Sequence, residues 1–137
     1  MARLTLRIDF DTADALGPGK IRLLECVRDT GSISAAGRAM AMSYRRAWLL
    51  IDTLNTSFRQ PVVTTKLGGK DGGGAVLTRF GEDLIKNYRE METIAHTALR
   101  PQLSMLERAL GSTPRTPVAH PIAPSRRLKS AGARPRS

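Results

Sequence analysis

Two short stretches of the sequence carry the residue types that bind polyanions. The stretch 43–49, SYRRAWL, places two adjacent arginines just behind a serine. Guanidinium groups hydrogen-bond to phosphates and to the edges of guanine bases. The stretch 68–74, GGKDGGG, contains five glycines around Lys70, and glycine lets a backbone approach a ligand closely. Both stretches therefore predict contact with nucleic acid, and the glycine stretch alone would also suit a nucleotide.

The glycine stretch has three interpretations: a phosphate cradle, a hairpin tip that lies against DNA, and a loop without ligand contacts. It does not fit the P-loop pattern, because no Gly-Lys-Ser or Gly-Lys-Thr stands at the required spacing. It also leads into a short apolar run, AVL, and not into a helix. We therefore favour the hairpin tip, with Lys70 as its charge, over the loop without contacts.

The composition is that of a small basic protein. The 137 residues carry a formal charge of +10, with 22 lysines and arginines against 12 acids, and this balance indicates a polyanionic partner. Hydrophobic residues make up 41% of the chain, enough for a modest core. The single cysteine excludes an internal disulfide. Because no signal peptide or apolar run of about 18 residues is present, we expect a cytoplasmic protein without a membrane partner.

The residue types give little support to catalysis or metal binding. Two histidines, His96 and His120, and the lone Cys26 form no spaced ligand cluster, and Cys26 fits a small core position. The sequence shows no paired carboxylates and no arrangement of nucleophile and base. We therefore expect a protein that is not an enzyme and that uses no metal or cofactor.

The charge is uneven along the chain and suggests two parts. Residues 31–80 hold seven basic and two acidic residues, and residues 111–137 hold six basic residues, five prolines and no acid. A segment of the second kind cannot bury enough apolar surface to fold. We predict one domain at 1–110, for DNA binding and dimerisation, and a disordered basic tail at 111–137. A remnant of cloning, a spacer, a DNA tether and a partner-binding segment all remain open for the tail.

The first half of the chain has the periodicity of one strand and three helices. Residues 4–10 alternate apolar and polar side chains, which predicts a half-buried strand. A helix follows Pro18 and suits an end at Gly31. Ser32 and Ser43 are N-cap candidates for the second and third helices.

The second half predicts a hairpin and a long helix. The β-branched run 62–67 and the apolar run 75–77 read as two strands around the glycines. The helix that begins at Thr78 ends or kinks at Pro101. Helices joined by a tight turn and followed by a hairpin make a winged helix-turn-helix. The predicted fold class is mainly α with a small β-hairpin, with a long C-terminal helix for dimerisation.

The third helix has an apolar face for the core and a polar face for DNA. Its apolar stripe is Ala47, Ile51, Leu54 and Phe58. In a helix-turn-helix, the N-terminal residues of this helix enter the major groove. The residues that we expect to bind DNA are Ser34, Ser43, Tyr44, Arg45, Arg46, Leu49, Lys70 and Gly72.

Several of these residues also have a simpler interpretation. Arg45 and Arg46 would suit an ordinary solvated helix face. Leu49 is either an exposed apolar residue or a contact for a thymine methyl group. Tyr44 fits packing or phosphate contact. Trp48, on the flank of the apolar stripe, is interpreted as structural.

The long helix carries a second apolar stripe with the spacing of a coiled-coil seam. We expect it to be exposed on a single chain and to form the interface of a homodimer. The members of the predicted interface are Phe80, Leu84, Tyr88, Met91 and Ala95.

The sequences SYRRAW and GGKDGGGAVLTRFG resemble the N-terminal DNA-binding domain of molybdate-responsive transcriptional regulators of the ModE type, which is similar to LysR-type winged helices. The resemblance covers roughly residues 3–100. It implies a dimeric module with DNA contacts at Ser43, Tyr44, Arg45, Arg46 and Lys70. Members of that family also carry C-terminal oxyanion-binding domains, where this chain has its basic tail. Molybdate binding by this chain alone is therefore not expected.

The expected function is that of a homodimeric regulator that binds double-stranded DNA at a pseudo-palindromic operator. Two alternatives stay open at this point. One is a nucleoid-associated protein with little sequence preference, and the other is an adaptor that pairs with a full-length regulator.

Overall fold

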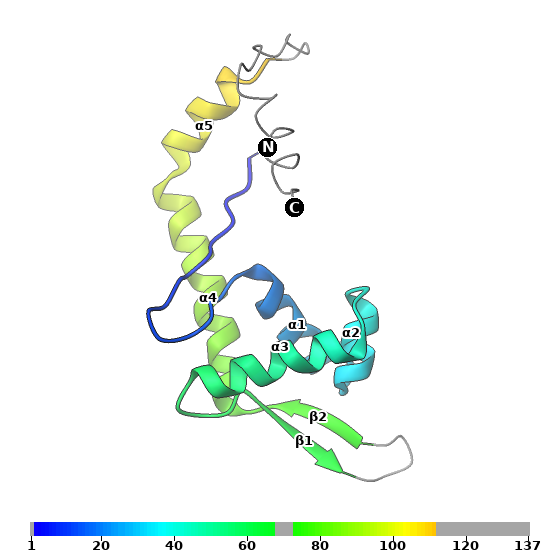
Figure 1. Cartoon of the computed structure of the whole chain (residues 1–137). Coiled ribbons are helices and arrows are strands. Elements are labelled where there is room, and N and C mark those ends of the chain that lie inside the picture. The colour runs from blue at the N-terminus through cyan, green and yellow to red at the C-terminus, as the bar shows by residue number, and fades with distance from the viewer. Residues whose placement is uncertain (1, 68–72, 112–137) are drawn as a thin grey trace, which may run out of the picture.

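The computed structural model describes residues 2–67 and 73–111 (Figure 1). Within them the chain forms five helices and one two-stranded antiparallel sheet. The predicted fold class, mainly α with a small hairpin in a winged helix-turn-helix, is confirmed. The predicted tail, Lys70 and Gly72 lie outside the described residues. The elements are α1 (Pro18–Thr30), α2 (Ile33–Ala39), α3 (Tyr44–Ser57), β1 (Val63–Leu67), β2 (Gly73–Leu77), α4 (Arg79–Ala98) and α5 (Arg100–Ala109).

The helix limits follow from local capping. The hydroxyls of Ser32, Ser43 and Thr78 each accept a hydrogen bond from the backbone N–H three residues further on, at 2.9, 3.1 and 2.9 Å. α1 ends at Gly31, whose φ of 82° lies in the left-handed region that favours glycine. All four predicted cap positions are confirmed. α4 also ends just before Pro101, as predicted.

The strand predicted at residues 4–10 is wrong. Among the described residues, Ile8 pairs only with Leu16, in an isolated antiparallel bridge with two hydrogen bonds of 2.8 Å. Alternating apolar residues indicate one buried side, but a strand also needs a neighbour that completes its ladder. The segment instead forms an extended arm beside α4 (Figure 1), where the Tyr88 phenol donates to the Leu6 carbonyl oxygen at 2.6 Å.

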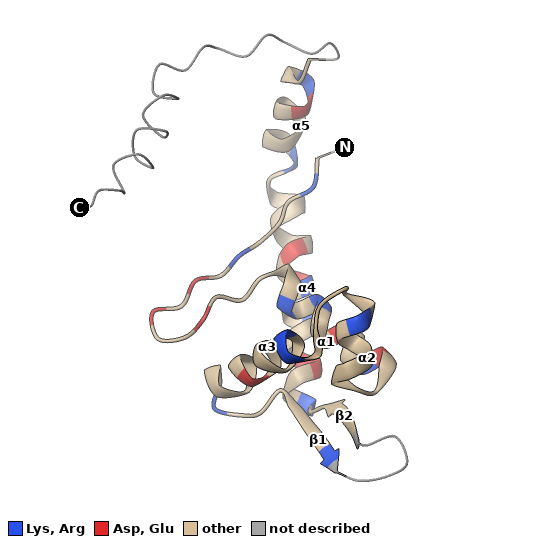
Figure 2. Ribbon diagram, turned by 45° about the vertical axis from the view of Figure 1, so that its right-hand side comes forward, with Lys and Arg blue, Asp and Glu red and all other residues tan. Residues whose placement is uncertain are grey.

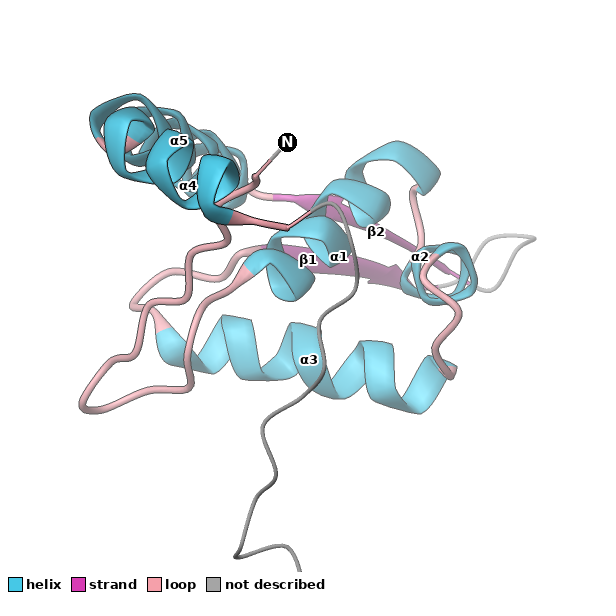
Figure 3. Cartoon of the chain, turned by 90° about the horizontal axis from the view of Figure 1, so that it is seen from above, coloured by secondary structure: helices cyan, strands magenta, loops and turns pink. Residues whose placement is uncertain are grey.

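The core is built around α1, which lies between α3 and α4 (Figure 3). The side chains of Ile21, Leu24 and Val27 are fully buried, as their helical spacing predicts. Cys26 is buried beside them, in the small core position expected for it.

The packing of α2 against α3 depends on small residues. A Cβ atom on Gly37 would lie only 3.2 Å from the Cβ of Ala47. The predicted stripe of α3 is buried at Ala47, Ile51 and Leu54, and Phe58 packs against the same core. The opposite face of α3 is thereby turned outward.

The hairpin is attached to the helices on both sides. β1 and β2 pair in antiparallel register. The side-chain oxygen of Asn55, near the end of α3, accepts from the N–H groups of Val62 and Val63 at 2.7 and 3.0 Å, and its amide donates to the Val63 carbonyl at 3.0 Å. On the other strand, the Ala75 N–H donates to the Gly31 carbonyl at 2.8 Å. The wing is therefore fixed to α3 and to the end of α1.

The predicted dimer seam on α4 requires a correction at Tyr88. This residue is 1% exposed, so it belongs to the core of a single chain and is not available to a partner. Phe80 and Leu84 are partly buried against the same core, because they share the inner face of the helix. Met91 is 42% exposed and Ala95 is half-buried. The interface itself stays a prediction.

α5 continues the direction of α4 and extends beyond the core (Figure 1). No residue of α5 is buried among the described residues. In the part of the chain that the structure describes, no helix combines the length and apolar character that crossing a membrane requires.

Candidate nucleic-acid interface

The first residues of α3 are exposed to solvent. Tyr44, Arg45 and Arg46 are all exposed, and Tyr44 is 57% exposed. The Ser43 hydroxyl accepts from the Arg46 N–H at 3.1 Å, which fixes the start of the helix. Ser43 therefore has a structural role as N-cap, and it also stands at the end of α3 that carries the positive helix dipole.

Two shallow hollows flank the arginines on α3. A hollow of about 270 Å³ is lined by Ser43, Arg45, Arg46, Leu49, Leu50 and Thr53. Leu49 is 46% exposed, as expected of a side chain that contacts DNA or solvent. The structure thus brings together five of the residues predicted to bind DNA, because Tyr44 adjoins Arg45 in the second hollow.

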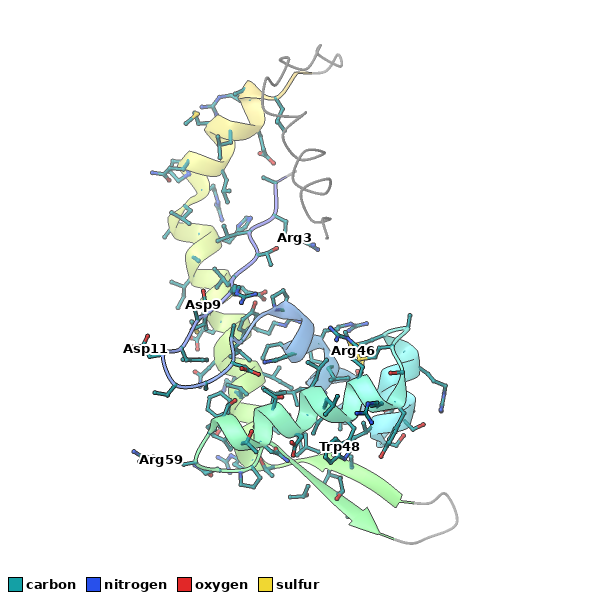
Figure 4. All side chains as sticks on the ribbon, in the orientation of Figure 1. Arg3, Asp9, Asp11, Arg46, Trp48 and Arg59 are labelled. Carbon is teal, nitrogen blue, oxygen red and sulfur yellow. The ribbon has the colours of Figure 1, made fainter. Side chains whose placement is uncertain are left out.

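Trp48 does not have the structural role interpreted from the sequence. It is 43% exposed, and with Tyr44 and Arg45 it lines the second hollow, of about 290 Å³. Figure 4 shows Trp48 on the side of α3 toward the hairpin. The sequence does indicate this position, because Trp48 stands four residues after Tyr44 and residues at this spacing share a helix face.

Ser34 lies on α2 and is half-buried. Its hydroxyl accepts a hydrogen bond from the Arg38 guanidinium at 2.9 Å. Arg38 is exposed, and the sequence prediction did not include it. The pair presents a cation on the helix that precedes the recognition helix, where helix-turn-helix proteins contact the DNA backbone.

The wing adds Lys66, which is exposed on β1. Lys70 and Gly72, the predicted contacts at the wing tip, lie outside the described residues. Asn55 was also not predicted, because its partners are backbone groups seven and eight residues further along the chain.

Charged residues of both signs lie near the candidate interface, and Asp52 is an exposed acid on α3 itself. Figure 2 shows basic residues at the start of α3 and on β1, and acidic residues on the loop of the N-terminal arm. Figure 4 labels Asp9 and Asp11 on that loop and Arg46 on the other side of the core. A duplex lying against α3 and the wing would therefore avoid the acids of the arm.

The described residues contain no group of three or more His, Cys, Asp or Glu side chains that could hold a metal ion. The perturbed titratable groups also lie elsewhere. The pKa of Glu25 on α1 is lowered by hydrogen bonds from Arg89, and burial raises the pKa of Tyr88.

Comparison of the sequence with known proteins connects the chain to a group of bacterial proteins. The chain is 39% identical over 99 residues to the molybdenum transport protein ModE of Azotobacter vinelandii, covering 72% of this chain and 36% of that protein. It is 41% identical over 103 residues to the molybdenum-pterin-binding protein MopB of Rhodobacter capsulatus, covering 75% and 37%. The DNA-binding transcriptional dual regulator ModE of Escherichia coli K12 is 40% identical over 81 residues, covering 59% and 31%.

These matches confirm the resemblance to ModE-type regulators that the motifs of the sequence indicate. The chain spans about a third of the length of these relatives. No family model matches the chain.

Proposed function

We propose that the chain is a DNA-binding transcriptional regulator that acts in the cytoplasm as a homodimer on a pseudo-palindromic operator. The observation that carries the proposal is the exposed, basic and capped N-terminus of α3 beside an antiparallel hairpin. The relatives named as transcriptional regulators support it.

The geometry suits a division of tasks along α3. Arg45 and Arg46 have the guanidinium groups that pair with guanine in the major groove, and Leu49 has the apolar surface that suits a thymine methyl. Trp48 stands toward the hairpin, and Tyr44 lines the same hollow. We place the sugar-phosphate backbone on this side. Contacts of the first kind would specify sequence, and contacts of the second kind would fix the orientation of the protein.

The experiment that tests this proposal is operator titration with two variants of the recognition helix. Operators are first selected from a random library with the wild-type chain. Arg45→Ala and Arg46→Ala should each weaken operator binding by about 1–3 kcal/mol, the range for a good base contact. Arg59→Ala is the matched control, because Figure 4 shows Arg59 at the opposite end of α3 from Arg46.

The outcomes separate the proposal from its alternatives. Unchanged operator affinity in both variants would exclude α3 as the reading element. Equal affinity of the wild type for operator and for random duplex would instead identify a nucleoid-associated protein. Absence of DNA binding, with capture by a full-length relative, would identify an adaptor.

Molybdate is not part of the proposed mechanism. The relatives with molybdenum in their names are about three times as long as the matched region. We propose that this chain, as given, binds its operator with equal affinity in the presence and absence of molybdate. Parallel titrations at the same ionic strength test this point.

A homodimer would explain the surface of the C-terminal helices. Ile94 on α4 is 60% exposed, and Met105 and Leu106 on α5 are 52% and 56% exposed. An amphipathic helix that extends from the core with its apolar side uncovered is typical of an interface. To bind two half-sites of a pseudo-palindromic operator, the α3 helices of such a dimer would have to lie about 34 Å apart, one turn of DNA.

A further inference from the structure

Asn55 connects the C-terminal half of α3 to the base of the hairpin. Its side-chain oxygen accepts hydrogen bonds from the N–H groups of Val62 and Val63, and its amide nitrogen donates to the Val63 carbonyl, at 2.7, 3.0 and 3.0 Å. Within the described residues, no other group of α3 forms a hydrogen bond with the hairpin. The hydrogen bonding between α3 and the wing therefore depends on this one side chain.

The chemistry of these partners suits an asparagine. Paired residues of an antiparallel sheet can exchange two hydrogen bonds, one from each N–H group to the opposite carbonyl. The Asn55 amide exchanges two hydrogen bonds with Val63 in the same manner, so it substitutes for a neighbouring strand at this point of β1. An aspartate would accept from the N–H groups but could not donate to the carbonyl.

The residues that Asn55 holds are removed from solvent. Val62 is 0% exposed and Val63 is 2% exposed. A buried backbone group that loses its partner raises the free energy of the folded state. The start of β1 must therefore follow the position of the Asn55 amide, which is set by the helix that carries it.

The other attachments of the hairpin lead to other helices. The Thr78 N–H, at the N-cap of α4, donates to the Val62 carbonyl at 2.9 Å, and the Ala75 N–H on β2 donates to the Gly31 carbonyl at 2.8 Å, at the end of α1. These hydrogen bonds place the hairpin against α4 and α1. Its direct placement against α3 is left to Asn55.

The two parts of the proposed DNA surface extend from this junction. Lys66 lies about 10 Å beyond Val63 along β1, and Arg46 lies about 14 Å back along α3 from Asn55. Figures 1 and 3 show the hairpin running from its base toward the side on which α3 begins. A duplex that contacts both cations therefore requires a fixed angle between α3 and the wing.

We propose that Asn55 is a positioning residue for DNA binding: its amide sets the wing at the angle to α3 that lets Lys66 reach a phosphate while Arg45 and Arg46 occupy the major groove. This role rests on the proposed function. Asn55 itself touches no DNA, and it acts through Val62 and Val63.

A double-mutant cycle tests this role on the full chain, since coupled residues give effects that are not additive. Operator binding is titrated at four or more salt concentrations for the wild type, Lys66→Gln, Asn55→Ala and the double variant. Asn55→Ala should reduce the slope of log K against log salt concentration by about 1, as loss of the Lys66 contact does. Lys66→Gln should then cause no further change in the Asn55→Ala background.

Arg45→Ala separates positioning from general damage to the fold. It should reduce operator affinity by the same factor in the wild-type and Asn55→Ala backgrounds, because α3 still reaches the major groove. Asn87→Ala is the matched control, since Asn87 is an exposed asparagine of α4, and it should retain the wild-type affinity and slope. Far-ultraviolet circular dichroism shows whether each variant is folded.

Asn55→Gln takes the place of Asn55→Ala if the alanine variant does not fold. It keeps the amide but adds one methylene group, so the amide can bond to Val63 only if the strand moves. The same loss of the Lys66 effect is expected.

A full effect of Lys66→Gln in the Asn55 variant would overturn the positioning role and leave the proposed function standing. Loss of the Arg45→Ala effect in that variant would also overturn it, because the whole surface would then be disturbed. A wild-type chain that binds no duplex would contradict the proposed function itself.

Discussion

Arg89 holds two carboxylates at once, Glu25 from α1 and Glu92 one turn further along α4. The hydrogen bonds from Arg89 lower the pKa of Glu25, and the partial burial of the carboxylate opposes this effect without reversing it. The side chain of Glu25 is 14% exposed. The pair therefore connects α1 to α4 with a charge that is mostly removed from solvent.

We expect Glu25→Gln to reduce the free energy of unfolding at pH 7 by about 1 kcal/mol, at the lower end for a charged hydrogen bond because Arg89 stays partly solvated. A carboxylate with a lowered folded-state pKa stabilises the protein above its unfolded-state pKa, near 4.5. This stabilisation is lost as the pH falls through the folded-state value. Urea unfolding at several pH values should therefore show the difference between wild type and variant disappear in acid.

Asp9→Asn provides the control for this prediction. Asp9 forms an ion pair with Arg7, and both side chains are 72% exposed. Exposed ion pairs contribute little to stability, so the free energy of unfolding of this variant should equal that of the wild type at every pH. A Glu25→Gln variant equally stable at pH 7, or a difference that persists in acid, would contradict the assignment.

Gly81 allows α4 to begin directly against the hairpin. A Cβ atom at this position would stand 2.3 Å from the Val62 carbonyl oxygen, and backbone cannot yield as a flexible side chain does. We predict that Gly81→Ala lowers the free energy of unfolding by about 1–3 kcal/mol, as overpacking does, in thermal or urea unfolding.

Gly19 is the matched position in α1, because a Cβ there would meet no described atom within 4 Å. Gly19→Ala should be neutral or stabilising by up to about 1 kcal/mol, through helix propensity. If Gly81→Ala and Gly19→Ala change the free energy of unfolding equally, the close approach of α4 to Val62 does not require glycine at position 81.

At the level of elements, the helix limits were the most predictable feature of the fold. A cap such as Ser43 acts on an N–H three residues away, so its signal is contained in a few letters of sequence. The hairpin was predictable for a similar reason, since both strands lie close together in the chain. The arm at 4–10 was not, because whether an alternating segment becomes a strand depends on a distant neighbour.

The candidate site was predictable to the extent that it lies on one helix. Arg45, Arg46 and Leu49 followed from the position of α3, and their exposure is observed. The exposure of Trp48 does not follow from the sequence, because a large aromatic residue beside a core stripe is usually buried. Asn55 gave no signal, since its partners are backbone groups that any residue would supply.

The buried position of Tyr88 changes how the dimer should be tested. A charged residue in place of Tyr88 would disrupt the fold of the single chain, because its charged side chain would be buried in the core. We predict that Ile94→Glu with Leu106→Glu gives folded monomers, since both residues are more than half exposed in one chain. Sedimentation at micromolar concentration measures the mass, and circular dichroism the fold.

Leu49→Glu is the control for oligomeric state, because Leu49 is also exposed but lies on α3. It should remain a dimer. If the wild-type chain sediments as a monomer, both the proposed dimer interface and the proposed pseudo-palindromic operator are wrong.

On the scale of the whole molecule, the charge of +10 should make DNA binding strongly dependent on salt. Each phosphate neutralised contributes about 0.9 to the slope of log K against log salt concentration. We expect Lys66→Gln to weaken operator and random duplex to a similar degree and to reduce this slope by about 1. Titrations at four or more salt concentrations provide the measurement.

Arg59→Gln should leave the slope unchanged, since Arg59 is at the end of α3 remote from Arg46 (Figure 4). If Lys66→Gln altered the preference for operator over random duplex, Lys66 would be reading bases and not phosphates. If it altered neither affinity nor slope, β1 would lie outside the DNA surface.

The hydrogen bond from Tyr88 to the arm ends on the main-chain carbonyl of Leu6 and not on a side chain. Every amino acid supplies that carbonyl, so a change of residue at position 6 leaves the acceptor in place. A change at position 88 removes the donor itself. Over evolutionary time, the arm should therefore drift in sequence within the limits of its apolar packing, while the aromatic hydroxyl at position 88 is retained.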